Sequence, residues 1–385
     1  MNDLQKILKE FHEIAASPQE QVKKYLAQNK KIIACAPIYT PEEIIHSMGM
    51  IPFGTWGGDI EIKEAKAYFP SFICSIMQSI LELGMTGVYD GISAIVIPSL
   101  CDSLKCLGQN WKYAVPQIKF IPMVYPQNRN TEYGIEFTKS SYERVISELE
   151  TITGQAFDEE KLKQSMVIYN YHNLVMRQFT DCVSEYSVIK ASDRSAVFKS
   201  AYFMEKSEHT ELVKKLLMEL QKTQKNEESG KNNKDVREEK NIRIITSGIL
   251  ADSKDLLAIF EENRMQIVAD DIAHESRQYR VDCKDTESAL DSLAEKFANM
   301  NNCSVLYDAD KGRAQFVVDL AKENKADGVI MVMTKFCDPE EFDYVIIKNK
   351  CEEEEIPLLL IEIDRQMVNY EQVRTAVQTF SEMLG

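Results

Sequence analysis

The chain has 385 residues, 44% hydrophobic and 28% charged, a composition typical of a globular protein that is too long for a single compact core. Its 61 acidic residues outnumber 45 basic ones and give a formal net charge of −16, which argues against general binding to nucleic acid or to anionic membranes. The N-terminal stretch MNDLQKILKEFHEIA is amphipathic and charged, and no apolar run approaches the roughly 20 residues of a membrane helix, so we expect a cytoplasmic protein.

The first third of the chain alternates short apolar runs with helix-like segments. TPEEIIHSMG is typical of a short helix in which Thr40 is the N-cap, Pro41 the first helical residue and Gly49 the stop. Ser71–Met85 is expected to form a mostly buried helix. This alternation predicts an α/β domain over residues 1–140, in which helices cover both faces of a parallel sheet. The expected strands are KIIACAP (Lys31–Pro37), ISAIVIP (Ile92–Pro98) and IKFIPMVYP (Ile118–Pro126).

The middle of the chain lacks strand signals, and we expect residues 141–220 to be helical. Asp158 is the expected N-cap of a long helix whose apolar residues recur at spacings of three, four and seven. These residues are Leu162, Met166, Tyr169, Met176, Phe179 and Val183. Residues 221–241 (QKTQKNEESGKNNKDVREEKN) carry almost no apolar side chain, so we expect a polar surface linker there.

Alternation resumes in residues 242–385, which we expect to form a second α/β domain. A helix is expected at Asn369–Leu384. The predicted fold class is therefore α/β, with two Rossmann-like parallel-sheet domains and an intervening helical region. The two halves could be distant structural duplicates. The expected strands are Ile242–Gly248, Met265–Asp271, Ser304–Asp308, Gly328–Phe336 and Pro357–Asp364.

Sequence motifs for nucleotide or serine hydrolase chemistry are missing. The sequence contains neither G-x-G-x-x-G after a strand nor G-x-x-x-x-G-K-[ST], and no G-x-S-x-G elbow. Nucleotide chemistry within this chain therefore has no support.

Four of the nine cysteines occupy positions that favour a functional thiol. Cys35, Cys101 and Cys337 follow apolar runs, at the carboxyl edge where open parallel sheets form their sites. Cys74 lies early in a helix expected to begin near Pro70 or Ser71, where the positive end of the helix dipole favours a thiolate. For any single cysteine, an inert core thiol is the commoner outcome. The other five are expected to be such thiols: Cys106, Cys182, Cys283, Cys303 and Cys351.

The spacing of the cysteines excludes common zinc and ferredoxin patterns. C-x₂-C and C-x₃-C pairs are missing, as is C-x₂-C-x₂-C. Widely separated cysteines can still converge between two domains, and three good ligands with a variable fourth would suggest a [4Fe–4S] cluster with an open position.

Other polar residues give weaker signals. His46, His172, His209 and His274 lack metal-ligand spacing, so we expect structural roles for them. The segment ADDIAHESRQYR (Ala269–Arg280) concentrates acidic and basic residues after a strand. A surface salt-bridge network is the expected arrangement there, with a ligand or partner contact as the alternative.

Several stretches together carry a family resemblance that covers essentially the whole chain in order. The sequence resembles the smaller (beta) subunit of the 2-hydroxyacyl-CoA dehydratases, fermentative enzymes related to benzoyl-CoA reductase. It is most similar to the types acting on 2-hydroxyisocaproyl-CoA and phenyllactyl-CoA, more than to the 2-hydroxyglutaryl-CoA type. The carrying stretches are YTPEEIIHSMGMIPFGTWGG, FICSIMQS, PSLCDSLKCLGQNWK, SGILADS, ADDIAHESRQYR and KFCDPEEFDY.

The resemblance implies a set of site residues. The cluster cysteines of the family's beta subunit fall onto Cys74, Cys101 and Cys337, each within its expected motif. The family's fourth ligand is not a protein cysteine, so the resemblance leaves Cys35 without an assigned role, although it could line the cluster pocket. The charged linker 221–241 is longer than the family pattern implies.

The resemblance also implies a mechanism and partners. An ATP-dependent iron–sulfur activator protein donates one electron, which reaches the thioester carbonyl of the (R)-2-hydroxyacyl-CoA. The resulting ketyl radical expels the 2-hydroxyl group, a β-proton leaves, (E)-2-enoyl-CoA forms and the electron is recovered. The larger (alpha) subunit binds most of the substrate, and the [4Fe–4S] cluster of the beta subunit serves as relay or reservoir.

Three other functions remain open on the sequence alone. One is a subunit of a benzoyl-CoA reductase-like or double-cubane reductase. Another is a scaffold subunit without a catalytic role, against which the three retained cysteines speak. The third is an α/β binding protein without metal.

Overall fold

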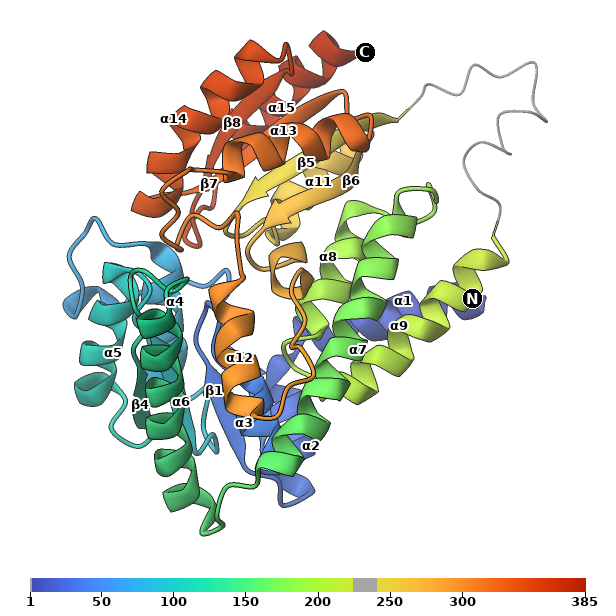
Figure 1. The fold of residues 1–385 in the computed structure, drawn as a ribbon. Coiled ribbons are helices and arrows are strands. Elements are labelled where there is room, and N and C mark those ends of the chain that lie inside the picture. The colour runs from blue at the N-terminus through green and yellow to red at the C-terminus, as the bar shows by residue number, and fades with distance from the viewer. Residues whose placement is uncertain (1, 224–240) are drawn as a thin grey trace.

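Two four-stranded parallel sheets form the framework of the chain in the computed structural model, which describes residues 2–223 and 241–385 (Figure 1). The first contains β1 (Ile32–Cys35), β2 (Ile51–Gly54), β3 (Ala94–Pro98) and β4 (Lys119–Met123), in spatial order β2-β1-β3-β4. The second contains β5 (Ile242–Gly248), β6 (Met265–Ile272), β7 (Gly328–Thr334) and β8 (Leu358–Ile363), in order β6-β5-β7-β8. The predicted α/β fold with two parallel-sheet domains is confirmed, and the second sheet repeats the strand order of the first.

Helices accompany both sheets and fill the region between them. Those before the second sheet are α1 (Asp3–Ala16), α2 (Pro18–Ala27), α3 (Glu42–Ser47), α4 (Ser75–Met85), α5 (Asp102–Ala114), α6 (Glu132–Thr153), α7 (Glu159–Val183), α8 (Ala191–Ser200) and α9 (Lys206–Gln221). Those after β5 are α11 (Lys254–Glu262), α12 (Ala289–Ala298), α13 (Arg313–Glu323), α14 (Asp338–Glu353) and α15 (Glu371–Leu384). Two short 3₁₀ turns are Ala65–Ala67 and Ser276–Tyr279.

The second sheet is buried on both faces, as its apolar strands predict. Every residue of β7 (GVIMVMT) is buried. One face packs against α11 and α15, through residues such as Phe260 and Val377, and the other against α13 and α14, through Val317 and Ile347. Strand β8 lies at the edge of the sheet and is partly exposed.

The middle helices join the two sheets into one molecule. Helix α12 follows β6 in the chain but packs against α6 and α7, away from the second sheet (Figure 1). The largest core cluster contains residues of the first sheet and of these helices, together with Ile249, Leu250 and Cys337 from the second sheet's loops. We propose residues 1–140, 141–220 and 242–385 as the division of the chain. The expected linker 221–241 lies outside the described residues except at its ends, Gln221–Thr223 and Asn241.

Several local predictions are corrected by the structure. Strand β2 was not predicted, and Ser304–Asp308 forms turns instead of a strand. Thr40 does not cap α3, because its hydroxyl donates to the carbonyl oxygen of Ala36 at 2.9 Å and the helix begins after Pro41. Helix α6 already begins at Glu132, before the predicted helical region. The prediction for Asp158 is confirmed, since its side chain accepts hydrogen bonds from two amides of α7.

No helix within the two described ranges combines the length and the apolarity needed to cross a membrane.

Buried histidines, among them His209 and His274, make the stability of this fold dependent on pH. Burial, followed by the charge of Lys206, lowers the pKa of His209 to about 3. Burial also lowers the pKa of His274 to about 3, against the opposing charge of Asp252. Because these pKa values lie below that of an unfolded histidine, the unfolded chain takes up the protons first as the pH falls. The free energy of unfolding should therefore be fully retained above about pH 6.5 and decrease below it, by roughly 1.4 kcal/mol per histidine at pH 5.5.

Urea unfolding near pH 8 and near pH 5.5 measures this effect. Between these two values the wild-type chain should lose about 1.4 kcal/mol more than the variant His274→Gln, which has no titrating ring at that position. An equal loss in the two proteins would contradict the assignment of His274 as a buried neutral histidine.

Candidate metal centre

A cavity of about 480 Å³ lies where the carboxyl ends of the two sheets meet. Its wall includes Ile38 after β1, Leu100 after β3, Ile249 after β5 and Phe336 after β7. In the first sheet β1 and β3 are neighbours, and in the second sheet β5 and β7 are. In each pair, the chain continues from one strand to one edge of the sheet and from the other strand to the opposite edge. Open parallel sheets bind ligands at such a switch point. The cavity is therefore formed by both switch points together.

Three cysteines from different parts of the chain line this cavity. Cys74 and Cys101 come from segments that belong to the first sheet, and Cys337 follows β7 of the second. Cys35 is not among the lining residues. It ends β1, is 4% exposed, and its thiol donates to the carbonyl oxygen of Ile33 at 3.6 Å. The structure thus separates Cys35 from the other three.

Each of the three cysteines is the N-cap residue of a helix. Cys74 precedes α4, Cys101 precedes α5 and Cys337 precedes α14. Helix α4 therefore begins at Ser75, four residues later than predicted. At a helix N-terminus the free backbone amides and the positive end of the dipole stabilise negative charge on a nearby sulfur. The positive N-terminal ends of the three helices thus lie at one cavity.

The backbone before Cys337 makes a sharp change of direction. Phe336 has a φ of 61°, which is unusual for an aromatic residue, and it lies between the end of β7 and the start of α14. Pro339 within the first helical turn and the acidic residues Asp338, Glu340 and Glu341 favour a helix beginning there. The resulting turn places Cys337 at the carboxyl edge of the sheet.

Burial is the largest influence on the pKa values of the three thiols. It raises the pKa of Cys74 to about 12, raises that of Cys101, and raises that of Cys337 well above its ordinary value. The amides of Ile76 and Met77 act on Cys74 in the opposite direction. Charge on Cys74, and less strongly on Cys101, also raises the pKa of Cys337, so the three sulfurs are electrostatic neighbours. Binding of a metal group would have to displace their protons.

The donor set suits a group larger than a single ion. Among residues 2–223 and 241–385, no three histidine, cysteine or acidic side chains lie close enough to hold one metal ion. A cubane iron–sulfur cluster binds each thiolate to a different iron, so its ligands are held farther apart. Three soft sulfur donors around a cavity of about 480 Å³ are compatible with such a group.

A buried ionic network supports the helix that follows Cys337. Glu340 is fully buried and accepts a hydrogen bond from the Ser304 hydroxyl at 2.6 Å and from Arg313 Nη2 at 2.8 Å. Arg277 lies 3.4 Å from the same carboxylate. Ser304 also lines the cavity. The first turn of α14 is thereby fixed to loops of the second sheet.

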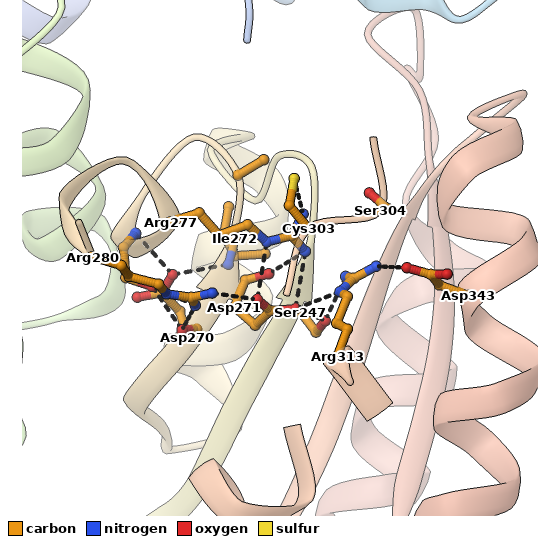
Figure 2. Close-up of polar contacts among 12 residues, drawn as sticks. Ser247, Asp270, Asp271, Ile272, Arg277, Arg280, Cys303, Ser304, Arg313 and Asp343 are labelled. Carbon is orange, nitrogen blue, oxygen red and sulfur yellow. Dashed lines mark hydrogen bonds and ion pairs between the residues drawn. The ribbon is translucent and has the colours of Figure 1, made fainter. Parts of the chain in front are cut away.

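Asp271, at the end of β6, is the centre of this network (Figure 2). Its carboxylate accepts from Arg277 Nε at 2.9 Å, Arg313 Nε at 2.8 Å, Arg280 Nη1 at 3.1 Å and the Ser247 hydroxyl at 2.9 Å. Burial opposes ionisation of Asp271, but the three guanidinium groups outweigh it and hold its pKa below the ordinary value. The carboxylate is therefore charged in the folded chain at neutral pH.

The prediction of a surface salt-bridge network in Ala269–Arg280 is wrong. Asp271 is 0% exposed and Arg277 is 3% exposed. The charged residues belong to the buried end of β6 and to the turn that follows it, which α7 covers. One available signal was that two arginines follow three acidic residues within this short segment, because buried carboxylates need such partners.

The site class can be stated from this geometry: two parallel sheets share a cysteine-lined cavity at their facing switch points. Comparison of sequences then identifies the family. The model described as "2-hydroxyglutaryl-CoA dehydratase, D-component" matches residues 37–384. The chain belongs to this family, as the sequence predicted.

Individual relatives agree with this family. The chain is 48% identical over 386 residues to the (R)-phenyllactyl-CoA dehydratase beta subunit of Clostridium sporogenes, with 100% of both chains covered. It is 35% identical over 386 residues to the (R)-2-hydroxyglutaryl-CoA dehydratase beta subunit of Acidaminococcus fermentans, with 98% and 99% covered. It is 24% identical over 363 residues to one of the benzoyl-CoA reductase subunits of Thauera aromatica, with 92% and 91% covered. The higher identity to the phenyllactyl relative and the link to benzoyl-CoA reductase were both predicted.

Proposed function

We propose that this chain is the beta subunit of an oxygen-sensitive 2-hydroxyacyl-CoA dehydratase, in which Cys74, Cys101 and Cys337 hold one [4Fe–4S] cluster. The reaction removes the hydroxyl group from C2 and a proton from C3 of an (R)-2-hydroxyacyl-CoA, releasing water and leaving an (E)-2-enoyl-CoA. The observation that supports it is the position of the three thiols around one cavity. The dehydratase relatives quoted above are named as beta subunits.

The residues of this chain would bind and shield the cluster. When bound, the cluster would supply one-electron storage or relay for a dehydration that proceeds through a substrate ketyl radical. The N-termini of α4, α5 and α14 would stabilise the thiolates. Apolar wall residues such as Ile38, Leu100 and Ile249 would exclude water from the site.

Exposed aromatic side chains in and next to the segments that line the cavity suit a protein partner. Tyr307 and Phe342 line the cavity and are 49% and 74% exposed, and Phe72, two residues before Cys74, is 70% exposed. We propose that a larger alpha subunit, which binds most of the substrate, covers them. Hydrogen exchange should slow at these segments when the complex forms. Slowing confined to α6–α9 would contradict this surface.

The proposed activity needs components that this chain does not supply. The sequence has no phosphate-binding loop, so an ATP-dependent activator protein would have to provide the electron. We expect the chain alone to dehydrate nothing. The complex with the larger subunit should convert (R)-phenyllactyl-CoA or (R)-2-hydroxyisocaproyl-CoA when activator, ATP and reductant are added.

Anaerobic assays that omit one component at a time test this expectation, with the enoyl-CoA product measured by chromatography. Sustained turnover by the chain alone would refute the proposed role. Reduction of benzoyl-CoA in place of dehydration would favour the reductase alternative.

A further inference from the structure

The three cysteines are attached to two different sheets. Cys74 and Cys101 are attached to the first sheet and Cys337 to the second, so the distances between their sulfurs depend on how the two sheets dock. Contacts that fix this docking near the cavity therefore influence the site without touching it. Arg365, which follows β8 and is 6% exposed, makes such contacts.

Arg365 reaches from the second sheet to the segments of the first. Its backbone amide donates to the hydroxyl of Ser75 at 3.0 Å, and Ser75 is the residue directly after Cys74. Its guanidinium group donates to the carbonyl oxygen of Trp56 at 3.2 Å and to Asp59 at 2.9 Å. Both Trp56 and Cys74 line the cavity. One residue thus contacts two segments that form the same wall.

The other side of Arg365 is fixed within the second half of the chain. Its guanidinium group forms an ion pair with Asp252 at 2.8 Å, and the Asp252 side chain is 2% exposed. Asp252 also pairs with Lys199 of α8 at 2.9 Å. Nη1 of Arg365 contacts both Asp59 and Asp252, and Nη2 contacts Asp252 and the Trp56 carbonyl oxygen, so the planar fork of donors serves three partners from two nitrogens.

We propose that Arg365 is a positioning residue that ties the Cys74 helix to the second sheet and so fixes the separation between Cys74 and Cys337. This inference rests on the proposed function, because it takes the three cysteines to hold a cluster. A cluster with three protein ligands depends on each of them, so a shift of the Cys74 helix would open the site to loss of iron.

Two variants and one control test the proposal in the complex purified anaerobically with the larger subunit. Arg365→Lys keeps the positive charge but not the fork. Asp59→Asn removes the charge from one of the three contacts that Arg365 makes to the segments of the first sheet, and because the Asp59 side chain is 44% exposed it leaves the core intact. The control is Arg194→Lys, because Arg194 is 3% exposed and pairs with Asp270 and Glu275 but does not line the cavity.

Release of iron to a ferrous chelator and hydrogen exchange are the two readouts. We expect Arg365→Lys to release iron about tenfold faster than wild type, since the buried Asp252 carboxylate and the Trp56 carbonyl oxygen lose donors of the guanidinium group. The acceleration in Asp59→Asn should be smaller, because only the charge of one partner is removed. Exchange should accelerate at residues 56–59 and 75–77 in both. Arg194→Lys should change neither the rate of iron release nor the exchange at these residues, even if it lowers the midpoint of unfolding.

The outcomes separate this proposal from the proposed function. Wild-type rates of iron release and exchange in Arg365→Lys, or an equal acceleration in Arg194→Lys, would overturn the role of Arg365. A wild-type complex whose iron content does not depend on the three cysteines would overturn the cluster assignment. The exchange measurement, which can be made on the metal-free chain, would still decide whether Arg365 ties the Cys74 helix to the second sheet.

Discussion

Replacing Cys337 by alanine should abolish dehydration by the complex, by at least about 100-fold, while the fold stays intact. The cluster would lose one of three protein ligands. The preceding strand β7 is held by packing, because all its residues are buried. Anaerobic activity assays and circular dichroism on the same samples measure both effects.

Cys351→Ala is the matched control for this prediction. Cys351 lies on the same helix, α14, and is 0% exposed, but it belongs to the apolar core and does not line the cavity. This variant should lose some stability and keep its activity. Full activity in Cys337→Ala, or equal loss in the two variants, would be inconsistent with a ligand role for Cys337.

Replacing Glu340 by alanine should destabilise the chain by about 3–5 kcal/mol, because it leaves two buried guanidinium groups without part of their compensating charge. Glu340 is 0% exposed and contacts Arg313 at 2.8 Å and Arg277 at 3.4 Å. Equilibrium unfolding in urea at neutral pH measures the change. Arg277 and Arg313 would still share Asp271, so some native structure should persist at low urea.

The neighbouring Glu341 provides the control for this effect. It lies in the same first turn of α14 but is exposed, so Glu341→Ala should change the free energy of unfolding by no more than about 0.5 kcal/mol. A similar decrease in the free energy of unfolding in both variants would show that negative charge at the start of α14 stabilises the chain more than the buried ionic network does.

The sequence predicts the sheets well where apolar runs are long and bounded by turns. Gly328–Phe336 predicted β7 because a continuous apolar run between helices is typical of a strand buried on both faces. Ile51–Gly54 was missed because it is only four residues long and contains proline and glycine. Ser304–Asp308 has strand-like residues, but Ser304 bonds to Glu340 and the segment lines the cavity, so tertiary contacts decide its conformation.

The sequence predicted the position of each cysteine within its own segment, but it did not predict that the three segments meet at one cavity. Periodicity places Cys101 and Cys337 at carboxyl edges of two separate sheets, yet nothing local indicates that these edges face each other. The N-cap position of Cys74 also depends on where α4 begins, which the sequence placed too early. The role of Arg365 is further removed, because Ser75 and Arg365 meet only through the docking of the two sheets.

Iron and sulfide analysis of the anaerobically purified complex tests the central claim most directly. Single alanine variants of Cys74, Cys101 and Cys337 should each lose one cluster, about four irons and four sulfides, relative to wild type. Cys35→Ala should retain them, since the Cys35 thiol bonds to Ile33 within the sheet and not to the cavity. Full iron content in any of the three variants, or loss of a cluster in Cys35→Ala, would contradict the assignment of these three cysteines as the cluster ligands.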